Sequence, residues 1–189
     1  MKMNRDPSLE YYTNLSLESK RVITRPVNRN DIEPWSDFFS SEEATEFFLP
    51  LEFATNKEKS NYWIERQLQR YKELKFGLHA IEEKDSKEFI GLCGLLAQDI
   101  DGSTQIEVGY SLLKKHWGKG FAPETTRLFI NYAFENKISD SVISIIHVKN
   151  LRSQRVAEKN GLKIEKRILW NDLDVFIFRI TAADFSKQF

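Results

Sequence analysis

The sequence predicts an α/β (α+β) fold, with a mixed and mostly antiparallel central sheet flanked by helices. Apolar patterning places the elements in the order β-α-α-β-β-β-α-β-α-β-β. Residues 76–113 contain three strand patterns joined by short turns, which is typical of an antiparallel meander. The length of 189 residues suits a single domain with a core that needs no disulfide or metal.

The first part of the chain contains one predicted strand and two predicted helices. Residues 21–27 have a strand pattern, and Asn30 or Asp31 then caps a helix whose first turn tolerates Pro34. A second helix covers residues 56–75. The apolar side chains of the two helices are Ile32, Trp35, Phe38, Phe39, Tyr62, Trp63, Ile64, Leu68 and Tyr71. Residues 1–16 are polar and weakly patterned, so we expect an extension, either flexible or lying on the surface, before a single domain over residues 17–189.

Strands and helices alternate through the rest of the chain. The predicted meander has strands at residues 76–82, 88–97 and 104–113, with turns at 83–86 and 99–103. A helix follows at about residues 122–136, and then a strand at 141–148. Asn150 caps a further helix that ends at Gly161, a suitable C′ residue. Strands at 163–169 and 174–181 complete the order.

Composition excludes several classes of protein. The 28 basic and 28 acidic side chains cancel, so we expect no direct nucleic-acid binding. One cysteine cannot form an internal disulfide, and Cys93 lies in an apolar run that reads as a buried strand. Three scattered histidines offer no metal-ligand spacing, so no metal is expected. No apolar run approaches the ~20 residues of a membrane helix, and no signal peptide is recognisable, so we expect a cytoplasmic protein.

The junction between the third meander strand and the next helix is the most informative stretch. Seven of the eight glycines lie between Gly77 and Gly120, and Gly118 and Gly120 flank Lys119 in this junction. Pro123 stands near the first turn of the helix. Unpaired backbone N–H groups and the helix dipole at such a junction favour an anion such as phosphate. An ordinary strand-to-helix turn is the alternative, and the pattern is neither a dinucleotide nor a Walker motif.

Residues 117–124, Trp-Gly-Lys-Gly-Phe-Ala-Pro-Glu, resemble the pyrophosphate-binding loop of the GNAT N-acetyltransferases, whose pattern is Gln/Arg-x-x-Gly-x-Gly/Ala. Gly120 and Ala122 match this pattern, whereas Trp117 stands where Gln or Arg is usual. With tryptophan at this position, the segment resembles the loop of the branch that contains the ribosomal-protein N-terminal (RimJ/RimL-type) acetyltransferases. Three further segments resemble that branch in the same order, and the likeness spans about residues 17–181. These segments are residues 18–26, 107–112 and 150–162.

The resemblance implies a transferase that passes an acetyl group from acetyl-CoA to an amine by direct attack. The implied pyrophosphate cradle consists of the backbone amides of Gly118, Lys119, Gly120, Phe121 and Ala122. The implied pantetheine strand consists of Tyr110, Ser111 and Leu112. Asn150 either caps its helix only or also bonds the pantetheine. Gly109 marks either a β-bulge or a close packing contact.

The resemblance also implies catalytic roles for two side chains. Glu107 either acts as the base through a water molecule or is a solvent-facing carboxylate. Ser153 resembles the branch's donor of a proton to the leaving thiolate, since Ala157 stands where many family members carry tyrosine. A weak, water-mediated base suits a protein α-amine, with a pKa of ~8, better than a lysine amine near ~10.4.

The acceptor side is less constrained by the sequence. Aromatic residues between positions 31 and 75 either pack in the core or line an acceptor cleft, and Glu42, Glu43 and Glu46 either attract a cationic amine or are solvated. His116 is expected at the surface. The acceptor is therefore a protein N-terminus or a small amine such as a polyamine or amine antibiotic, and a non-catalytic acyl-CoA-binding module is the rival class. An exposed final strand would support a homodimer.

Overall fold

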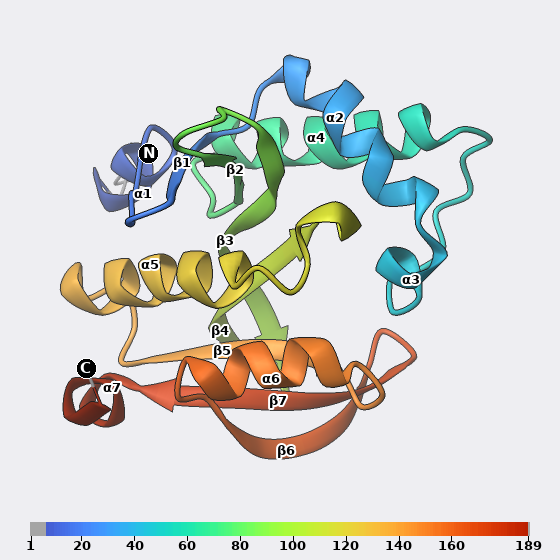
Figure 1. Ribbon diagram of the computed structural model, residues 1–189. Helices are drawn as coiled ribbons and strands as arrows, with labels where there is room; N and C mark the ends of the chain where they lie inside the picture. The colour runs from blue at the N-terminus through green and yellow to red at the C-terminus, as the bar shows by residue number, and fades with distance from the viewer. Residues whose placement is uncertain (1–6, 189) are drawn as a thin grey trace, which may run out of the picture.

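The computed structural model describes residues 7–188 and contains a seven-stranded sheet of order β1-β2-β3-β4-β5-β7-β6 (Figure 1). Its neighbours pair antiparallel except β4 and β5, which are parallel. This confirms the mixed, mostly antiparallel sheet. The strands are β1 (Val22–Pro26), β2 (Leu78–Glu83), β3 (Phe89–Ile100), β4 (Ser103–Leu112), β5 (Ser141–His147), β6 (Lys163–Trp170) and β7 (Leu173–Thr181).

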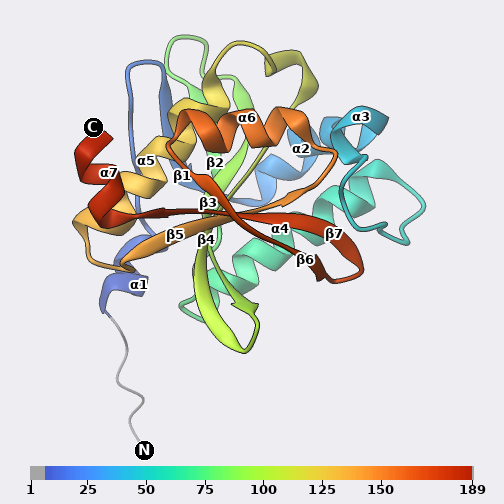
Figure 2. The ribbon, with the colours of Figure 1, turned by 90° about the horizontal axis from the view of Figure 1, so that it is seen from below.

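Helices cover both faces of the sheet, as Figure 2 shows from below, with α5 and α6 on one side and α4 on the other. The predicted element order is confirmed, and short helices are added to it. The α-helices are α1 (Pro7–Tyr12), α2 (Ile32–Ser36), α3 (Glu42–Thr45), α4 (Asn56–Lys72), α5 (Phe121–Glu135), α6 (Leu151–Lys159) and α7 (Ala182–Gln188). Three 3-10 turns join them, η1 (Arg29–Asp31), η2 (Asp37–Ser40) and η3 (Lys114–His116).

The start of the first predicted helix differs from the prediction. Asn28, rather than Asn30 or Asp31, is the cap: its side chain accepts from the Asn30 amide, and Asp31 accepts from the Asn28 amide in return. Instead of one continuous helix, the chain then forms three short helical elements, η1, α2 and η2. A second reciprocal cap, between Thr55 and Glu58, begins α4. Both starts follow from short side chains that satisfy the first free amides of a helix.

Part of the segment predicted as an N-terminal extension, residues 1–16, packs against the core. Tyr12 and Leu15 are buried. The Tyr12 hydroxyl donates to the Gly77 carbonyl at 2.7 Å and accepts from the Leu95 amide at 2.7 Å. Tyr12 therefore links the residue before β2 to the middle of β3, and residues 1–6 of the predicted extension lie outside the described residues.

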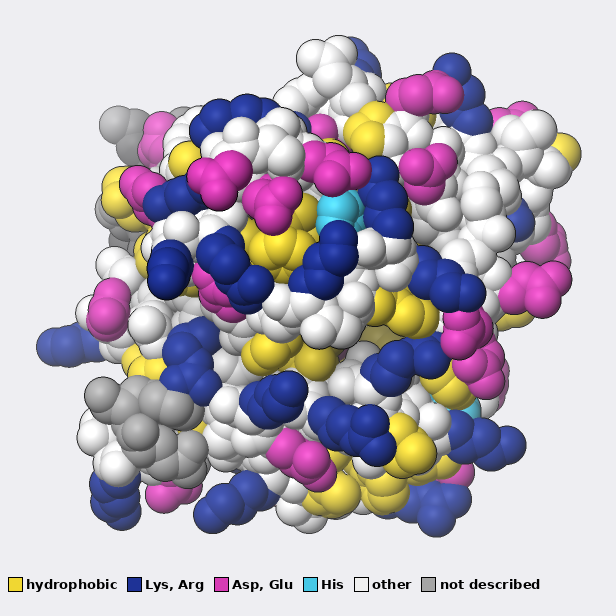
Figure 3. All heavy atoms as spheres, viewed as in Figure 1, with side chains coloured by type: hydrophobic (Ala, Val, Ile, Leu, Met, Phe, Trp, Pro, Cys, Tyr) yellow, Lys and Arg dark blue, Asp and Glu magenta, His cyan; other side chains and the backbone are white. Residues whose placement is uncertain are grey.

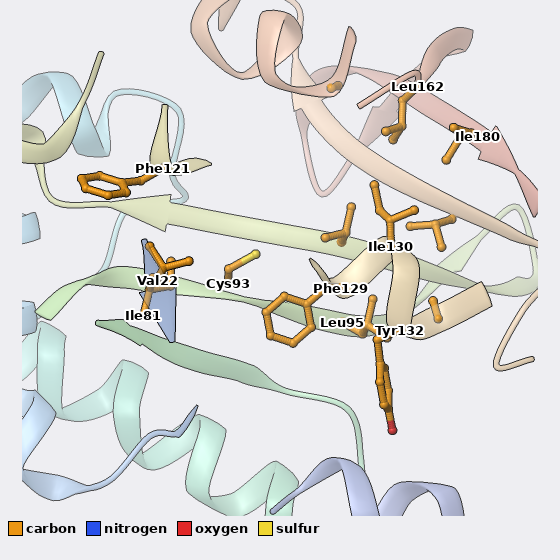
Figure 4. Packing of buried hydrophobic residues seen from close by; sticks show 14 of the residues in the cluster. Val22, Ile81, Cys93, Leu95, Phe121, Phe129, Ile130, Tyr132, Leu162 and Ile180 are labelled. Carbon is orange, nitrogen blue, oxygen red and sulfur yellow. The ribbon is translucent and has the colours of Figure 1, made fainter. Parts of the chain in front are cut away.

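The core divides between the two faces of the sheet. On the face of α5 and α6, Figure 4 shows side chains from β1, β2, β3 and α5 meeting in one cluster, among them Val22, Ile81, Cys93 and Phe129. Cys93 is fully buried, as predicted, and burial raises the pKa of its thiol. On the opposite face, Trp35 and other side chains of α2, η2 and α4 pack against β2 and β3.

One of the two alternatives for Gly109 is excluded, and the expectation about the final strand is wrong. The register between β3 and β4 runs unbroken from Gly91↔Leu112 to Ile100↔Ser103, with Gly109 opposite Gly94, so Gly109 marks no bulge. The final strand β7 pairs with β5 on one side and β6 on the other, so it offers no free edge to a second copy. The edge on that side of the sheet is β6.

His79 predicts a specific loss of stability in acid. It is fully buried among the rings of Tyr12, Tyr71 and Phe129, and burial lowers its pKa from 6.5 to about 4. The unfolded chain therefore takes up a proton that the folded chain refuses, and stability falls as pH drops from about 6.5 toward 4. We expect His79→Phe, measured by urea unfolding, to remove about 2 kcal/mol of the decrease between pH 7 and pH 5. Equal decreases in both proteins would contradict this assignment.

Candidate active site

The site begins where β4 and β5 part. Their parallel ladder has one registered pair, Glu107↔Ile143, after which the strands diverge (Figure 1). The Ser144 hydroxyl donates to the Val108 carbonyl at 2.9 Å and so satisfies a buried acceptor beside this pair. Beyond it, the C-terminal residues of β4 pair with β3 on one side and have no registered partner in β5 on the other. This free edge can accept an extended ligand as an added strand.

A cavity of about 330 Å³ opens beside this edge. Its walls come from the end of β4, the loop before α5, the start of α6, and the η2–α3 segment. Figure 3 shows Lys and Arg side chains on the face that carries α5 and α6. The predicted residues that line the cavity are Tyr110, Ser111, Leu112, Gly118, Gly120, Phe121, Ala122, Asn150 and Ser153. Glu107 and Lys119 are not part of its wall.

The loop before α5 has the geometry of an anion cradle. Gly118 and Gly120 adopt φ of 75° and 84°, a left-handed conformation that glycine reaches without strain, and Gly120 is the N-cap of α5. Within the described chain, no protein oxygen accepts a hydrogen bond from the backbone amides of residues 118–122. These donors at a helix N-terminus fit a pyrophosphate group.

Arg21 holds this loop from β1's side of the sheet. Its guanidinium donates to the Lys119 carbonyl at 2.9 Å, lies 4.7 Å from the centre of the Phe121 ring, and pairs with Glu124, with 2.8 Å between Nε and Oε2. Ser19 also donates to Glu124, at 2.6 Å. Sequence reasoning assigned Arg21 no role, although it lies in one of the segments that carry the family resemblance. Its position identifies it as a residue that orients the cradle.

Trp117, the departure from the usual loop pattern, closes the end of β4. Its indole N–H donates to the Leu112 carbonyl at 2.9 Å, and the Arg152 guanidinium lies 4.5 Å from its ring centre. The neighbouring His116 was expected at the surface, but it is 3% exposed and lines the cavity. The η3 turn directs its ring inward against Phe121, and burial lowers its pKa.

The start of α6 is joined to β4 across the gap. Asn150 accepts from the Ser153 amide at 3.1 Å, which confirms its role as a cap. The Tyr110 hydroxyl donates to the Ser153 carbonyl at 2.9 Å, and burial raises the pKa of this phenol. Ser153 therefore lies beside the free edge of β4. Ala157, where many family members carry tyrosine, is fully buried and does not line the cavity.

Glu107 is a buried carboxyl group, so the solvent-facing alternative is wrong. It is 8% exposed and projects from the face of β4 opposite to Tyr110, toward α4. Gln98 donates to its Oε2 at 2.7 Å. Burial raises its pKa, and the bond from Gln98 opposes that shift. A carboxyl group with a raised pKa is a better proton acceptor than an exposed one when it is ionised.

Some of the aromatic residues between positions 31 and 75 pack in the core, and others line the cavity. Trp35 is fully buried in the core. Phe38, Phe47 and Phe48 line the cavity. Phe53 lies outside it, with its ring 5.2 Å from that of Tyr62 beside a second, more open groove along α4.

Among residues 7–188, no three His, Cys, Asp or Glu side chains gather as a group that could hold a metal ion. In the same residues, no helix combines the length and the apolar character that a bilayer crossing requires.

The family model described as Acetyltransferase (GNAT) domain matches residues 21–163. This chain belongs to the GNAT acetyltransferase family. It is therefore an acetyltransferase, and the family uses acetyl-CoA and an amine acceptor. The matched residues include β1, the cradle loop and α6, so the family assignment covers the cavity described above.

Known proteins are similar to this GNAT chain in sequence or in fold. The uncharacterized N-acetyltransferase YoaA of Bacillus subtilis (strain 168) is 30% identical over 151 residues, which cover 79% of this chain and 83% of YoaA. An acetyltransferase from Agrobacterium tumefaciens str. C58 has a TM-score of 0.75 at 22% identity, covering 90% and 96% of the two chains. RimJ from Mycobacterium smegmatis, solved with CoA-disulfide, has a TM-score of 0.72 at 18% identity, covering 86% and 83%. The two structures establish the shared fold.

The cradle can be tested with a pair of glycine variants. In Gly120→Val, the new Cβ lies 3.3 Å from an Arg21 nitrogen at a left-handed φ, so the cradle must shift. We expect its dissociation constant for acetyl-CoA, measured by calorimetry, to rise at least tenfold. Gly102→Val is the matched control, because Gly102 has a φ of 77° and open space around it, outside the cavity. Equal affinities of Gly120→Val and the control would remove the cradle assignment.

Proposed function

We propose that this GNAT acetyltransferase transfers the acetyl group of acetyl-CoA by direct attack of a primary amine, and that the amine is a protein N-terminus of the ribosomal-protein type. One observation carries the proposal. Gly118, Gly120, Phe121 and Ala122 with their unpaired amides, the free edge of β4 and Ser153 border a single cavity. A ligand with a pyrophosphate at one end and an extended amide-containing arm fits that arrangement.

The residues of the cavity have separate tasks in this proposal. Acetyl-CoA supplies an activated thioester, the amides of residues 118–122 bind its pyrophosphate, and Tyr110, Ser111 and Leu112 pair with its pantetheine. A backbone amide at this edge of β4 polarises the thioester carbonyl as the amine attacks. Ser153 donates a proton to the sulfur when the carbon–sulfur bond breaks.

Glu107 receives the proton that the attacking amine loses, through a water molecule, because its carboxyl group lies outside the cavity wall. A protein α-amine with a pKa of ~8 is roughly one-tenth neutral at pH 7, whereas a lysine amine near ~10.4 is neutral about once in 2,500 molecules. A base that acts at a distance is therefore adequate for an α-amine. A structurally similar protein, RimL, is described as a ribosomal L7/L12 alpha-N-protein acetyltransferase, which supports the same acceptor class.

For an acetyltransferase, a small amine, such as a polyamine or an amine antibiotic, is the competing acceptor. A non-catalytic acyl-CoA-binding module is disfavoured, because the chain belongs to an enzyme family and a buried carboxyl group and a serine flank the free edge of β4. An acceptor screen monitored by CoA release distinguishes the two amine classes.

The catalytic roles predict a loss of rate with retained binding. We expect Glu107→Gln and Ser153→Ala each to lower kcat at least tenfold in the CoA-release assay, because general acid–base groups contribute typically ~10²–10⁴-fold. The dissociation constant for acetyl-CoA should change less than threefold in Glu107→Gln, because Glu107 does not line the cavity. The control is Glu158→Gln, which changes an exposed carboxylate on α6 and should leave kcat unchanged. Unchanged kcat in the two test variants would remove both roles.

A further inference from the structure

The cavity continues past the free edge of β4 into an apolar end. Phe38, Ala44, Phe47 and Phe48, all from the η2–α3 segment and the turn after it, form this end. Phe38 is 1% exposed and Ala44 is buried, while Phe47 and Phe48 are half-buried. Since Phe47 and Phe48 border open space, a bound apolar group would cover them further.

Contacts with three distant elements hold this aromatic end beside the free edge of β4. Glu43 of α3 pairs with Lys114 of η3 at 2.5 Å and with Arg152 of α6 at 3.2 Å. The Phe47 ring stacks on His147, at the end of β5, with 4.8 Å between ring centres. The α3 segment therefore spans the open end between β4 and β5. Phe47 and Phe48 therefore line the same cavity as Ser111 and Leu112 at the end of β4.

Charge disfavours a polycation in this cavity. Among the described residues that line it, the carboxylate is Glu43, which already pairs with two cations. Lys114 holds the pKa of this carboxyl group below its ordinary value, so it stays ionised within its ion pairs. Arg152, Arg155 and Lys159 add positive charge to the wall. That balance attracts the phosphates of a CoA ester and repels an acceptor with several ammonium groups.

We propose, on the basis of the proposed acetyl transfer, that the acceptor is an amine with an apolar or aromatic group next to its nitrogen, and that Phe47 and Phe48 select it. For a protein acceptor, this group is the first side chain of the polypeptide. For a small acceptor, it is an arylalkyl group such as that of phenylethylamine. Polyamines and other polycationic amines are poor acceptors.

The test compares acceptors at saturating acetyl-CoA. Peptides that differ only in their first residue (Phe, Leu, Ser or Lys), phenylethylamine and spermidine are assayed by CoA release. We expect kcat/KM for the Phe or Leu peptide, or for phenylethylamine, to exceed that for the Lys peptide and for spermidine at least tenfold. Phe47→Ala should reduce this ratio at least fivefold. Phe53→Ala, an aromatic variant outside the cavity, should leave the ratio unchanged.

Different results overturn the two proposals. No turnover of any amine, with acetyl-CoA still bound, would contradict the proposed transfer to these acceptors. Turnover with spermidine preferred, or a ratio unaffected by Phe47→Ala, would overturn the apolar acceptor site and leave the transfer intact. The inference is also overturned if Phe47→Ala alters the preference between acetyl-CoA and butyryl-CoA but not the preference among acceptors, because the aromatic end would then hold the acyl chain.

Discussion

The separation of β4 from β5 is the constraint on which the rest of the site depends. Two parallel strands in the middle of a sheet ordinarily pair along their length, because an unpaired backbone group in the interior is costly. Here the ladder has one registered pair, and the Ser144 hydroxyl satisfies the Val108 carbonyl at the point of separation. The gap is bridged further on by the Tyr110 hydroxyl, which reaches the backbone of α6. The free edge is therefore a stable feature of the folded chain.

The elements around the gap are positioned by polar contacts between segments far apart in the sequence. The pair between Arg21 and Glu124 links β1 to the first turn of α5. Such a partly exposed pair contributes typically ~0–1 kcal/mol to stability, so its effect lies in orientation more than in energy. The hydrogen bond from Arg21 to the Lys119 carbonyl fixes the position of the cradle loop in the same way. The same logic holds for Glu43, which positions α3 through two cations at the surface.

Several residues could be assigned from the sequence and others could not. The glycine loop before α5, the Asn150 cap and the buried strand around Cys93 were predictable, because each depends on neighbours within a few positions. His116 was misplaced because a 3-10 turn redirects its ring, and polar residues near a loop are usually exposed. The sequence left Glu107 either a base or a solvent-facing carboxylate, and only the folded structure shows that its side chain is buried and accepts from Gln98.

By itself, the sequence determined the order of the elements, the meander, the position of the cradle loop and the family to which the chain belongs. These depend on apolar periodicity, turn residues and helix caps, which act over short stretches of chain. Only the tertiary structure decided which aromatics line the cavity, that Glu107 and His116 are buried, and that Arg21 orients the cradle. These depend on contacts such as that of Arg21 with Glu124, 103 residues apart, whose geometry arises when the sheet brings β1 beside α5.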